Sequence, residues 1–209
     1  IVGGTGLYLE SLIYGIEYEE IKIDIEYRNH LEKVEQEKGL QFLYEEAEKI
    51  DEQATKKISP NDKKRIFRIL EIYKATGKTK TQLEQDSRKQ KPEFNYVLFG
   101  INMDRQKLYE RINKRVDIMI ENGLIDEVIN LSKKYNEFPT AMQGLGYKEV
   151  LEYLQGKLTK EEMIEKIKMM TRRYAKRQLT WFRKYDNITW LDGLKSVEDN
   201  IKIIESIAL

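Results

Sequence analysis

The sequence predicts an α/β protein with a parallel-sheet core, a mostly helical inserted domain and helices at the C-terminal end. Short apolar runs occur at the start of the chain, near residue 96 and near residue 188, and long amphipathic segments separate them. Strands that alternate with helical segments are typical of parallel sheets. We therefore expect residues 1–17 and 93–209 to form the core and residues 18–92 to form the insertion.

The composition excludes several kinds of site. The 209 residues include no cysteine, which excludes disulfides, thiolate metal sites and cysteine nucleophiles, and the one histidine, His30, is expected on a helix surface. The 37 basic and 36 acidic residues leave a net charge of +1, so a nucleic-acid site must come from local clustering. No apolar run approaches the roughly 18 residues of a membrane span, and we expect a cytoplasmic protein with no membrane partner.

The chain opens with Ile1-Val2-Gly3-Gly4-Thr5-Gly6, an apolar run that enters a glycine turn. This pattern predicts a buried strand that meets the helix after it, and we expect the chain to be a C-terminal piece of a longer protein. Thr5 and the backbone amides of the turn can approach a phosphate or a ribose. Ligand contact and simple packing explain these glycines equally well.

Apolar residues at three- and four-residue spacing predict helices from Ile25 to about Leu83. Residues 59–62 interrupt them, with Asn61 or Asp62 as the N-cap of the next helix. That helix is expected to end near Gly77 and to bury Ile66, Ile69, Leu70 and Tyr73.

Gly77-Lys78-Thr79 resembles the end of a phosphate-binding Walker loop. The glycine that such a loop needs five residues earlier is replaced by Ile72, inside the predicted helix. We interpret Gly77 as the residue that ends this helix.

An interior strand over Asn95–Ile101 leads into an amphipathic helix from Asp104 to about Glu121, with the apolar stripe Leu108, Ile112, Val116 and Met119. Arg111 and Arg115 lie together along one edge of that stripe. On an average helix, snorkelling arginines are the commoner explanation. Because the carboxyl end of a parallel strand borders the ligand crevice, and guanidinium groups bind phosphate oxygens bidentately, we expect this pair to bind a diphosphate.

The last long helix is predicted from about Lys160 to Lys184, with Met163, Ile167, Met170, Tyr174 and Trp181 as its buried stripe. Six basic residues and no acidic one occur between positions 172 and 184: Arg172, Lys176 and Arg183 on the face opposite the stripe, and Arg173, Arg177 and Lys184 around it. A second basic cluster, with Asp62 as its one acid, contains Lys56, Lys57, Lys63, Lys64, Arg65 and Arg68. Solvated basic faces are the usual alternative, but six cations with no acid among them exceed what solubility needs. Two separate basic patches fit folded RNA better than a small ligand.

Four motifs occur together along the chain. They are Val2-Gly3-Gly4-Thr5-Gly6-Leu7-Tyr8, Pro60-Asn61-Asp62 with Arg65 and Arg68, Gly144-x-Gly146-Tyr147-Lys148-Glu149, and Lys176-Arg177-Gln178-x-Thr180-Trp181-Phe182-Arg183. In this order and at this spacing they closely resemble the bacterial tRNA dimethylallyltransferase family, the tRNA isopentenyl-diphosphate transferases. The resemblance covers essentially the whole chain.

This resemblance implies an activity. The family transfers a dimethylallyl group from dimethylallyl diphosphate to the exocyclic amino nitrogen of the adenosine 3′-adjacent to the anticodon, in tRNAs that read codons beginning with U. It flips the target base into a channel, as chemistry on a base requires. The resemblance further implies a P-loop-kinase-like, ATP-binding type of core, Mg²⁺ as the cofactor that helps to hold the diphosphate, the tRNA anticodon stem-loop as partner, and a cytoplasmic monomer.

The resemblance also assigns residues. Thr5, Arg111 and Arg115 are candidate catalytic residues, with Thr5 also beside the target nucleotide. The remaining tRNA contacts that it implies are Arg28 in the inserted domain, then Lys64, Arg65, Ile66, Phe67 and Arg68, then Gln143, Gly144, Leu145, Gly146, Tyr147 and Lys148, and finally Lys176, Arg177, Gln178, Trp181 and Arg183. It assigns no metal ligand to this chain.

The family's P-loop, which holds the diphosphate and Mg²⁺, does not occur in this sequence, and neither does the acidic residue expected to act as base. Two other classes of function therefore stay open. One is a non-catalytic RNA-binding module that uses the same basic helices. The other is a small-molecule P-loop kinase relative, against which the two basic patches argue.

Overall fold

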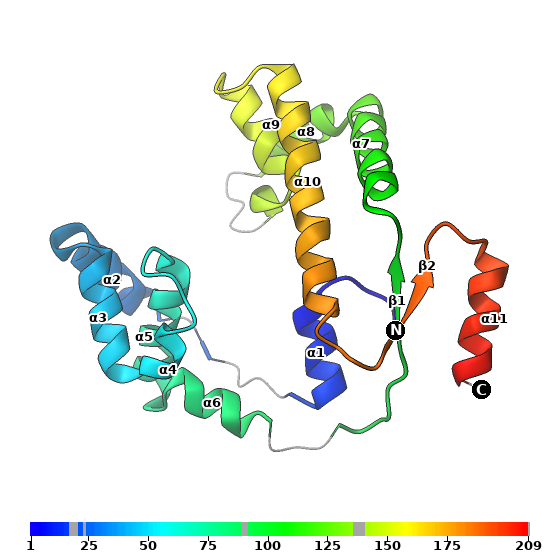
Figure 1. The fold of residues 1–209 in the computed structure, drawn as a ribbon. Coiled ribbons are helices and arrows are strands. Elements are labelled where there is room, and N and C mark those ends of the chain that lie inside the picture. The colour runs from blue at the N-terminus through cyan, green and yellow to red at the C-terminus, as the bar shows by residue number, and fades with distance from the viewer. Residues whose placement is uncertain (17–20, 23, 89–91, 136–140, 209) are drawn as a thin grey trace. The chain divides into compact units, whose positions relative to one another are not determined.

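The computed structural model describes residues 1–16, 21–22, 24–88, 92–135 and 141–208 (Figure 1). The chain is mostly helical with one small parallel sheet, as expected for an α/β protein. It forms two compact units, a core unit of Ile1–Gly6 with Tyr96–Leu209 and a helical unit of Leu7–Asn95. The domain borders expected near residues 17 and 92 stay a prediction.

The helical unit consists of helices, several of which have their starts fixed by capping side chains. Its helices are α1 (Gly6–Tyr14, starting at the last residue of the first core segment), α2 (Ile25–Lys38), α3 (Leu40–Ile50), α4 (Glu52–Thr55), α5 (Lys63–Thr76) and α6 (Lys80–Asp86). A side-chain oxygen accepts a backbone hydrogen bond at the start of α2, α4, α5 and α6. Of the two candidate N-caps before α5, Asp62 is the one that caps the helix.

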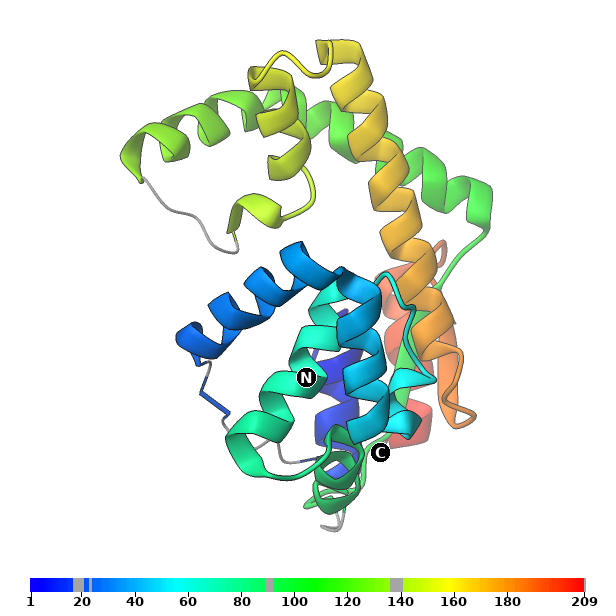
Figure 2. The ribbon, with the colours of Figure 1, turned by 90° about the vertical axis from the view of Figure 1, so that its left-hand side faces the viewer.

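The core of the helical unit lies between α2, α3 and α5, which pack against one another (Figure 2). Its buried residues are Leu31, Leu43, Ala47, Ala54, Ile66, Phe67, Ile69 and Leu70. The prediction for Tyr73 is wrong, because this side chain is 43% exposed. α5 packs against three helices, α2, α3 and α6, so the side of it that is buried differs from the single face that the sequence predicts. This buried side includes Phe67 and Ile72 and leaves out Tyr73.

The interpretation of Gly77-Lys78-Thr79 as a helix end is confirmed. Gly77 ends α5 in the left-handed conformation, with a φ of 69°, and its amide donates to the Tyr73 carbonyl. Thr79 then caps α6 in a reciprocal capping box with Gln82.

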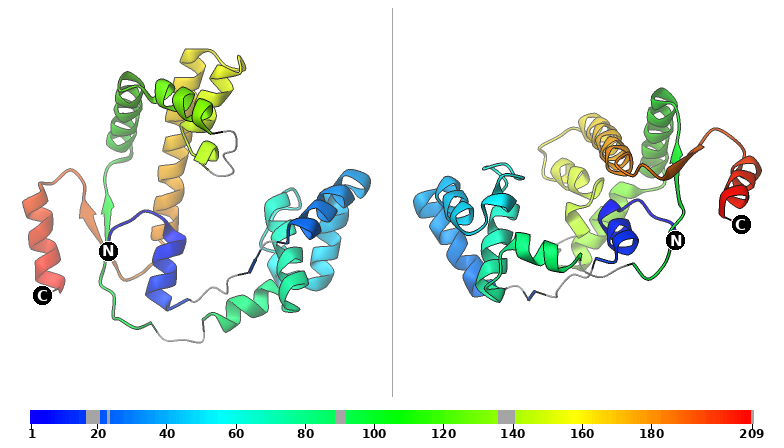
Figure 3. Two further views of the ribbon diagram at one scale, coloured as in Figure 1. Left: turned by 180° about the vertical axis from the view of Figure 1, so that it is seen from behind. Right: turned by 60° about the horizontal axis from the view of Figure 1, so that its bottom comes forward.

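The core unit contains β1 (Leu98–Asn102), α7 (Arg105–Glu121), α8 (Leu124–Lys134), the 3₁₀ turn η1 (Ala141–Gln143), α9 (Tyr147–Leu154), α10 (Lys160–Phe182), β2 (Ile188–Asp192) and α11 (Val197–Ala208). β1 and β2 pair in parallel, with Gly100 opposite Trp190, and α11 packs beside β2 (Figure 3). The predicted interior and closing strands are therefore both present.

The expectation of a buried strand at the start of the chain is wrong. The side chains of Ile1 and Val2 are 91% and 102% exposed, and residues 1–5 form no strand. A strand needs a neighbour to take its backbone hydrogen bonds, and neither β1 nor β2 pairs with these residues.

The hydrophobic core of this unit lies between α7, α8, α9 and the first half of α10. Its buried residues are Val116, Leu124, Val128, Met142, Val150, Met163 and Ile167. Tyr174, predicted in the buried stripe of α10, is 43% exposed, because the buried side chains of α10, Met163 and Ile167, lie in its first half. Figure 1 shows that α10 continues well beyond α9. No helix in the described part of the chain is long and apolar enough to cross a bilayer.

Candidate functional site

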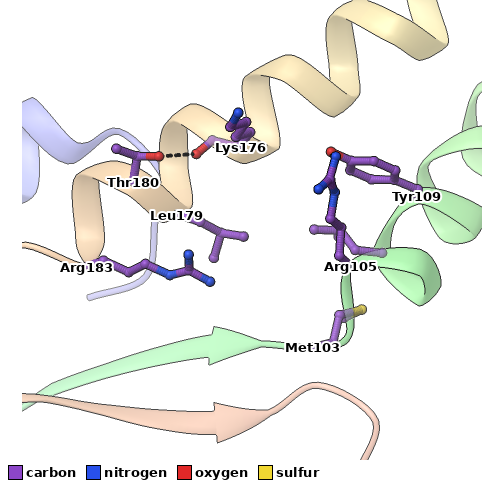
Figure 4. A pocket seen from close by; sticks show the side chains of 8 residues that line it. Met103, Arg105, Tyr109, Lys176, Leu179, Thr180 and Arg183 are labelled. Carbon is purple, nitrogen blue, oxygen red and sulfur yellow. Dashed lines mark hydrogen bonds between the residues drawn. The ribbon is translucent and has the colours of Figure 1, made fainter.

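A basic pocket lies between the first turns of α7 and the last turns of α10, at the carboxyl end of β1 (Figure 4). Its volume is about 180 Å³, and its lining includes three cationic side chains and no carboxylate. The residues that line it are Met103, Arg105, Leu108, Tyr109, Lys176, Leu179, Thr180 and Arg183. A concave site that combines apolar walls with cations suits an anionic ligand that carries an apolar or aromatic part.

The sequence around Asp104 determines where α7 begins, and so positions the side chains of α7 that line this pocket. Asp104 follows β1 and caps α7, because its carboxylate accepts hydrogen bonds from the amides of Gln106 (2.9 Å) and Lys107 (3.1 Å). Arg105 therefore occupies the first helical turn, and Tyr109 lies directly above it at the i+4 position.

Two arginines flank the Tyr109 ring. The Arg105 guanidinium lies 5.2 Å from the ring centroid, and its Nε donates to the Tyr109 hydroxyl at 3.2 Å (Figure 4). Arg172 of α10 lies 5.9 Å from the same ring and donates to Asn113 Oδ1 at 2.6 Å. The prediction that Arg172 faces away from the buried side is wrong, because the side chain joins α10 to α7.

The other predicted basic residues toward the end of α10 are exposed: Arg173, Lys176, Arg177, Arg183 and Lys184. Lys176, Arg177 and Arg183 form no ion pair with any residue that the structure describes. Two of the cations lie over rings, Arg177 at 5.6 Å from the centroid of Tyr174 and Lys184 at 3.8 Å from that of Trp181. Lys176, Arg177 and Arg183 therefore present cations that a phosphate backbone can reach.

Arg111 reaches the carboxyl edge of the sheet. Its guanidinium donates to the Gly193 carbonyl at 3.3 Å, and the Gly193 amide donates to Asn102 at the end of β1 at 2.7 Å. Arg115 is exposed one helical turn further along α7. The structure thus places Arg111 at the edge where a parallel sheet binds ligands, as expected, while the diphosphate role of both arginines stays a prediction.

A model of the IPP transferase family matches residues 1–185. The chain belongs to this family. The tRNA dimethylallyltransferase of Acetivibrio thermocellus is 47% identical over 208 residues, which make up 99% of this chain and 66% of that protein. The enzyme of the same name from Thermoanaerobacter sp. (strain X514) is 49% identical over 204 residues, covering 95% of this chain and 65% of that protein. The chain thus spans slightly less than two thirds of these relatives.

Solved structures agree with this family. The full-length tRNA isopentenylpyrophosphate transferase of Bacillus halodurans is 41% identical with a TM-score of 0.62, over 99% of this chain and 64% of that one. A eukaryotic dimethylallyltransferase, described as acting on tRNA, is 30% identical with a TM-score of 0.72, over 99% of this chain and 54% of its own.

Within this family member, the segment Lys64 to Arg68 does not present all its side chains. Ile66 and Phe67 are 0% and 2% exposed, so the expectation that these two side chains contact tRNA is wrong. Both belong to the core of the helical unit, and the helical periodicity already placed Ile66 there. Lys64 and Arg65 are exposed and Arg68 is half-buried, so all three remain accessible.

The cations of the helical unit are more fully paired than the sequence suggested. Lys63 pairs with Glu35, Lys56 with Glu52 at 2.6 Å, and Arg65 with Asp62 at 3.2 Å. Asp62 is the one acid within the basic segment, as the sequence shows, but Glu35 and Glu52 from outside it also pair with its lysines. Arg28 of α2 lies with its Nε 3.0 Å from Oε1 of Glu71, a carboxylate that is 6% exposed.

The turn before α9 is built around a buried acid that sequence reasoning left without a role. Glu149 is 3% exposed, and its carboxylate accepts a hydrogen bond from the Gly146 amide at 2.8 Å. Gly146 adopts a φ of 98°, which favours glycine. A glutamate three residues after the N-cap is the spacing of a capping box, so the sequence carried a sign of this contact.

The turn presents several of its predicted contact residues. Gln143, Gly144, Leu145 and Lys148 are exposed. The Tyr147 hydroxyl donates to Glu127, and this hydrogen bond, with a smaller contribution from burial, raises the pKa of Tyr147 above its ordinary value. Tyr147 therefore stays protonated at neutral pH and is oriented by α8.

Sequence reasoning also missed Arg105 and Tyr109. The sequence pattern that could have indicated them is an arginine directly after an N-cap aspartate, followed by an aromatic residue four positions later.

The described residues contain no group of three or more His, Cys, Asp or Glu side chains that could hold a metal ion. The acids nearest the carboxyl edge, Asp104 and Asp192, accept backbone hydrogen bonds there instead.

Proposed function

We propose that this chain is part of an enzyme that transfers a dimethylallyl group from dimethylallyl diphosphate to the exocyclic amino nitrogen of the adenosine 3′-adjacent to the anticodon, in tRNAs reading codons that begin with U. The observation that carries the proposal is 47% identity to a tRNA dimethylallyltransferase along 99% of the chain. The same similarity favours the enzyme over a non-catalytic RNA-binding module.

In the proposed reaction, a bond forms between the adenosine amino nitrogen and the allylic carbon, and the bond from that carbon to the diphosphate oxygen breaks. The nitrogen loses a proton and diphosphate leaves. Negative charge therefore grows on the leaving oxygen, and fixed cations close to it lower the barrier. Arg111 and Arg115 are the residues we propose for this role, since both extend from the helix that follows β1.

The anticodon stem-loop is the proposed partner of the basic surfaces. Lys176, Arg177 and Arg183 on α10 are proposed to contact its phosphates, together with Lys64, Arg65, Arg68 and the exposed residues of the turn before α9. Arg105 adds a further cation at the pocket between α7 and α10. Phosphate contacts of this kind fix the register of the RNA while the flipped base is held elsewhere.

The finer features of the proposal are a P-loop-kinase-like core with a helical insertion, a cytoplasmic location and a monomer. Mg²⁺ is proposed as the cofactor that neutralises the diphosphate, but the described residues of this chain do not fit a metal site. The role we assign to these residues is therefore to bind phosphate through arginine and lysine, without metal ligation.

The proposal is tested by incubating the complete gene product with radiolabelled dimethylallyl diphosphate and unmodified tRNA, then digesting the RNA to nucleosides. Label in a prenylated adenosine from the position 3′ to the anticodon is the expected result. An anticodon stem-loop with guanosine at that position is the control and should stay unlabelled. A preparation that binds tRNA tightly but transfers no label would instead support the RNA-binding module.

A further inference from the structure

The turn Gly4-Thr5-Gly6, called here the Thr5 turn, packs directly on α10. The side-chain amide of Gln178 donates to the Gly4 carbonyl at 2.9 Å, and the same nitrogen lies 3.4 Å from the Tyr174 hydroxyl. The contact joins residues 174 positions apart in the sequence, so it fixes the turn from outside its own segment.

Close packing explains the two glycines that flank Thr5. A Cβ on Gly4 would lie 2.2 Å from Gln178 Nε2, and a Cβ on Gly6 would lie 2.3 Å from both Cδ1 and Nε1 of Trp181. Neither glycine adopts a positive φ, so close approach and not backbone conformation disfavours a side chain here. The constraint is strong at Gly6, which faces the rigid indole ring, and weaker at Gly4, which faces the terminal amide of a flexible side chain. Gly3, one residue before the turn, has open space where a Cβ would lie.

Thr5 is the exposed residue between these two anchored positions. The Trp181 ring fills the space beside Gly6, and its indole Nε1 is buried with no hydrogen-bond partner among the described residues. A nucleic acid cannot reach this N–H unless the turn moves. The packing thus leaves the Thr5 side chain as the part of the turn that a ligand meets.

The opposite side of α10 carries the basic pocket. Residues 174, 178 and 181 follow one another at helical spacing and face the turn, whereas residues 176, 179 and 183 line the pocket. α10 therefore holds the Thr5 turn on one face and presents cations on the opposite face. The orientation of α10 about its own axis thus determines the positions of both the turn and the cations.

We propose that Gln178 and Trp181 are positioning residues that hold the Thr5 turn on α10, and so set the place of the Thr5 hydroxyl, rather than residues that contact RNA. The expected effect of this positioning on dimethylallyl transfer rests on the proposed function, whereas the packing itself does not. It revises the expectation that both side chains bind tRNA, and it assigns the two flanking glycines to packing instead of ligand approach.

The first experiment is a double-mutant cycle in the complete gene product, with Gln178→Met and Thr5→Ala. Methionine keeps the length of the side chain and removes the donor. We expect Gln178→Met to slow single-turnover transfer at saturating tRNA by about tenfold, the order expected for one hydrogen bond, with tRNA affinity changed less than about twofold. In the Thr5→Ala background the same change should cost little more, because Gln178 acts through Thr5.

Independent effects of the two substitutions, or a decrease in tRNA affinity in Gln178→Met that matches the decrease in rate, would overturn the proposal. A merely structural role for Gln178 would lower the melting temperature, and that is measured alongside. If the unsubstituted protein transfers no dimethylallyl group, the proposed function fails, and the second experiment tests the packing by itself.

The second experiment uses tryptophan fluorescence. The chain has two tryptophans, so Trp190→Phe leaves Trp181 as the one reporter. In that background, Gly6→Ala should shift the emission of Trp181 and increase its quenching by acrylamide, because the added methyl displaces the ring from the turn. Gly3→Ala is the matched control and should change neither. Identical spectra and quenching for Gly6→Ala and Gly3→Ala would show that the turn is not held by Trp181.

Discussion

Thr81 donates two hydrogen bonds to the carboxylate of Asp51, one from its amide at 2.8 Å and one from its hydroxyl at 2.6 Å. The same carboxylate caps α4 by accepting from the Ala54 amide at 3.0 Å, and Asp51 is 5% exposed. One buried side chain therefore joins the end of α3, the start of α4 and the first turn of α6 within the helical unit.

This arrangement predicts a pH-dependent contribution to stability. Burial by itself would raise the pKa of Asp51, but the hydrogen bonds from Thr81 and Ala54 outweigh it and leave the pKa below its ordinary value. A carboxylate whose pKa is lowered by folding stabilises the protein above its unfolded pKa of about 4, and this contribution disappears as the pH falls through the folded value.

We expect Asp51→Asn to lower the free energy of unfolding by about 1–3 kcal/mol near neutral pH, since an amide nitrogen would face the Thr81 donors. The difference from the unsubstituted protein should narrow below about pH 4. Denaturant unfolding at both pH values measures it, with Glu32→Gln, an exposed carboxylate of α2, as control. A difference that is the same at both pH values would contradict the hydrogen-bond account.

A second prediction concerns Arg28, which lies beside the buried Glu71. Arg28→Ala should destabilise the helical unit because it leaves a buried carboxylate without its cation. Since Arg28 is itself 40% exposed, we expect a decrease in stability of about 1–2 kcal/mol, with recovery in the Arg28→Ala/Glu71→Gln double variant.

Thermal melts of these variants test the pairing, with Lys33→Ala as the control for an exposed cation on the same helix. If Arg28 serves tRNA alone, its alanine variant will bind tRNA less tightly and melt at the unchanged temperature.

The features that the sequence predicted correctly are local. Asp62, Asp104 and Gly77 mark helix ends because each acts on a backbone group within a few residues. The packing of Gln178 on Gly4 joins residues that are 174 positions apart, and no local pattern encodes such a contact. Ile66 and Phe67 show a different limit, since a motif names a continuous segment while a helix buries only part of it.

Charge pairing was hard to predict for a related reason. Glu35 and Glu52 lie outside the basic segment in sequence and pair with its lysines in the fold. On α10, by contrast, Lys176, Arg177 and Arg183 meet no acid among the described residues, as the local sequence suggested. A basic run in the sequence therefore indicates unpaired cations only if no other helix or strand brings an acidic side chain to it in the fold.

The third prediction follows from these three cations of α10. Binding of the complete gene product to an anticodon stem-loop should weaken steeply with salt, and a Lys176→Ala/Arg177→Ala/Arg183→Ala variant should bind with a shallower slope. Removing one phosphate-binding cation lowers the magnitude of the log–log slope by roughly 0.7–0.9. A folded triple variant that keeps the parent slope would remove the end of α10 from the interface.

The fourth prediction separates donor binding from tRNA binding. Arg111→Ala and Arg115→Ala should impair use of dimethylallyl diphosphate by about 1.5–3 kcal/mol each, the size expected for a charge-assisted hydrogen bond, and leave tRNA affinity nearly unchanged. Lys114→Ala is the matched control, being an exposed cation on the same helix. Variants that bind tRNA more weakly with unchanged donor kinetics would place the two arginines on the RNA surface instead.

The last prediction concerns the Thr5 hydroxyl. Because Thr5 is exposed and its turn is anchored through Gly4 and Gly6, Thr5→Ala should leave the melting temperature unchanged. It should slow single-turnover transfer at saturating tRNA more than it weakens tRNA binding, since phosphate contacts elsewhere supply most of the affinity while this hydroxyl orients the reacting nucleotide. Thr5→Ser keeps the hydroxyl and should retain most of the rate, which separates hydrogen bonding from shape. A Thr5→Ala protein with the parent rate would mean that Thr5 only completes the turn, and the positioning of that turn by α10 would then have no catalytic consequence.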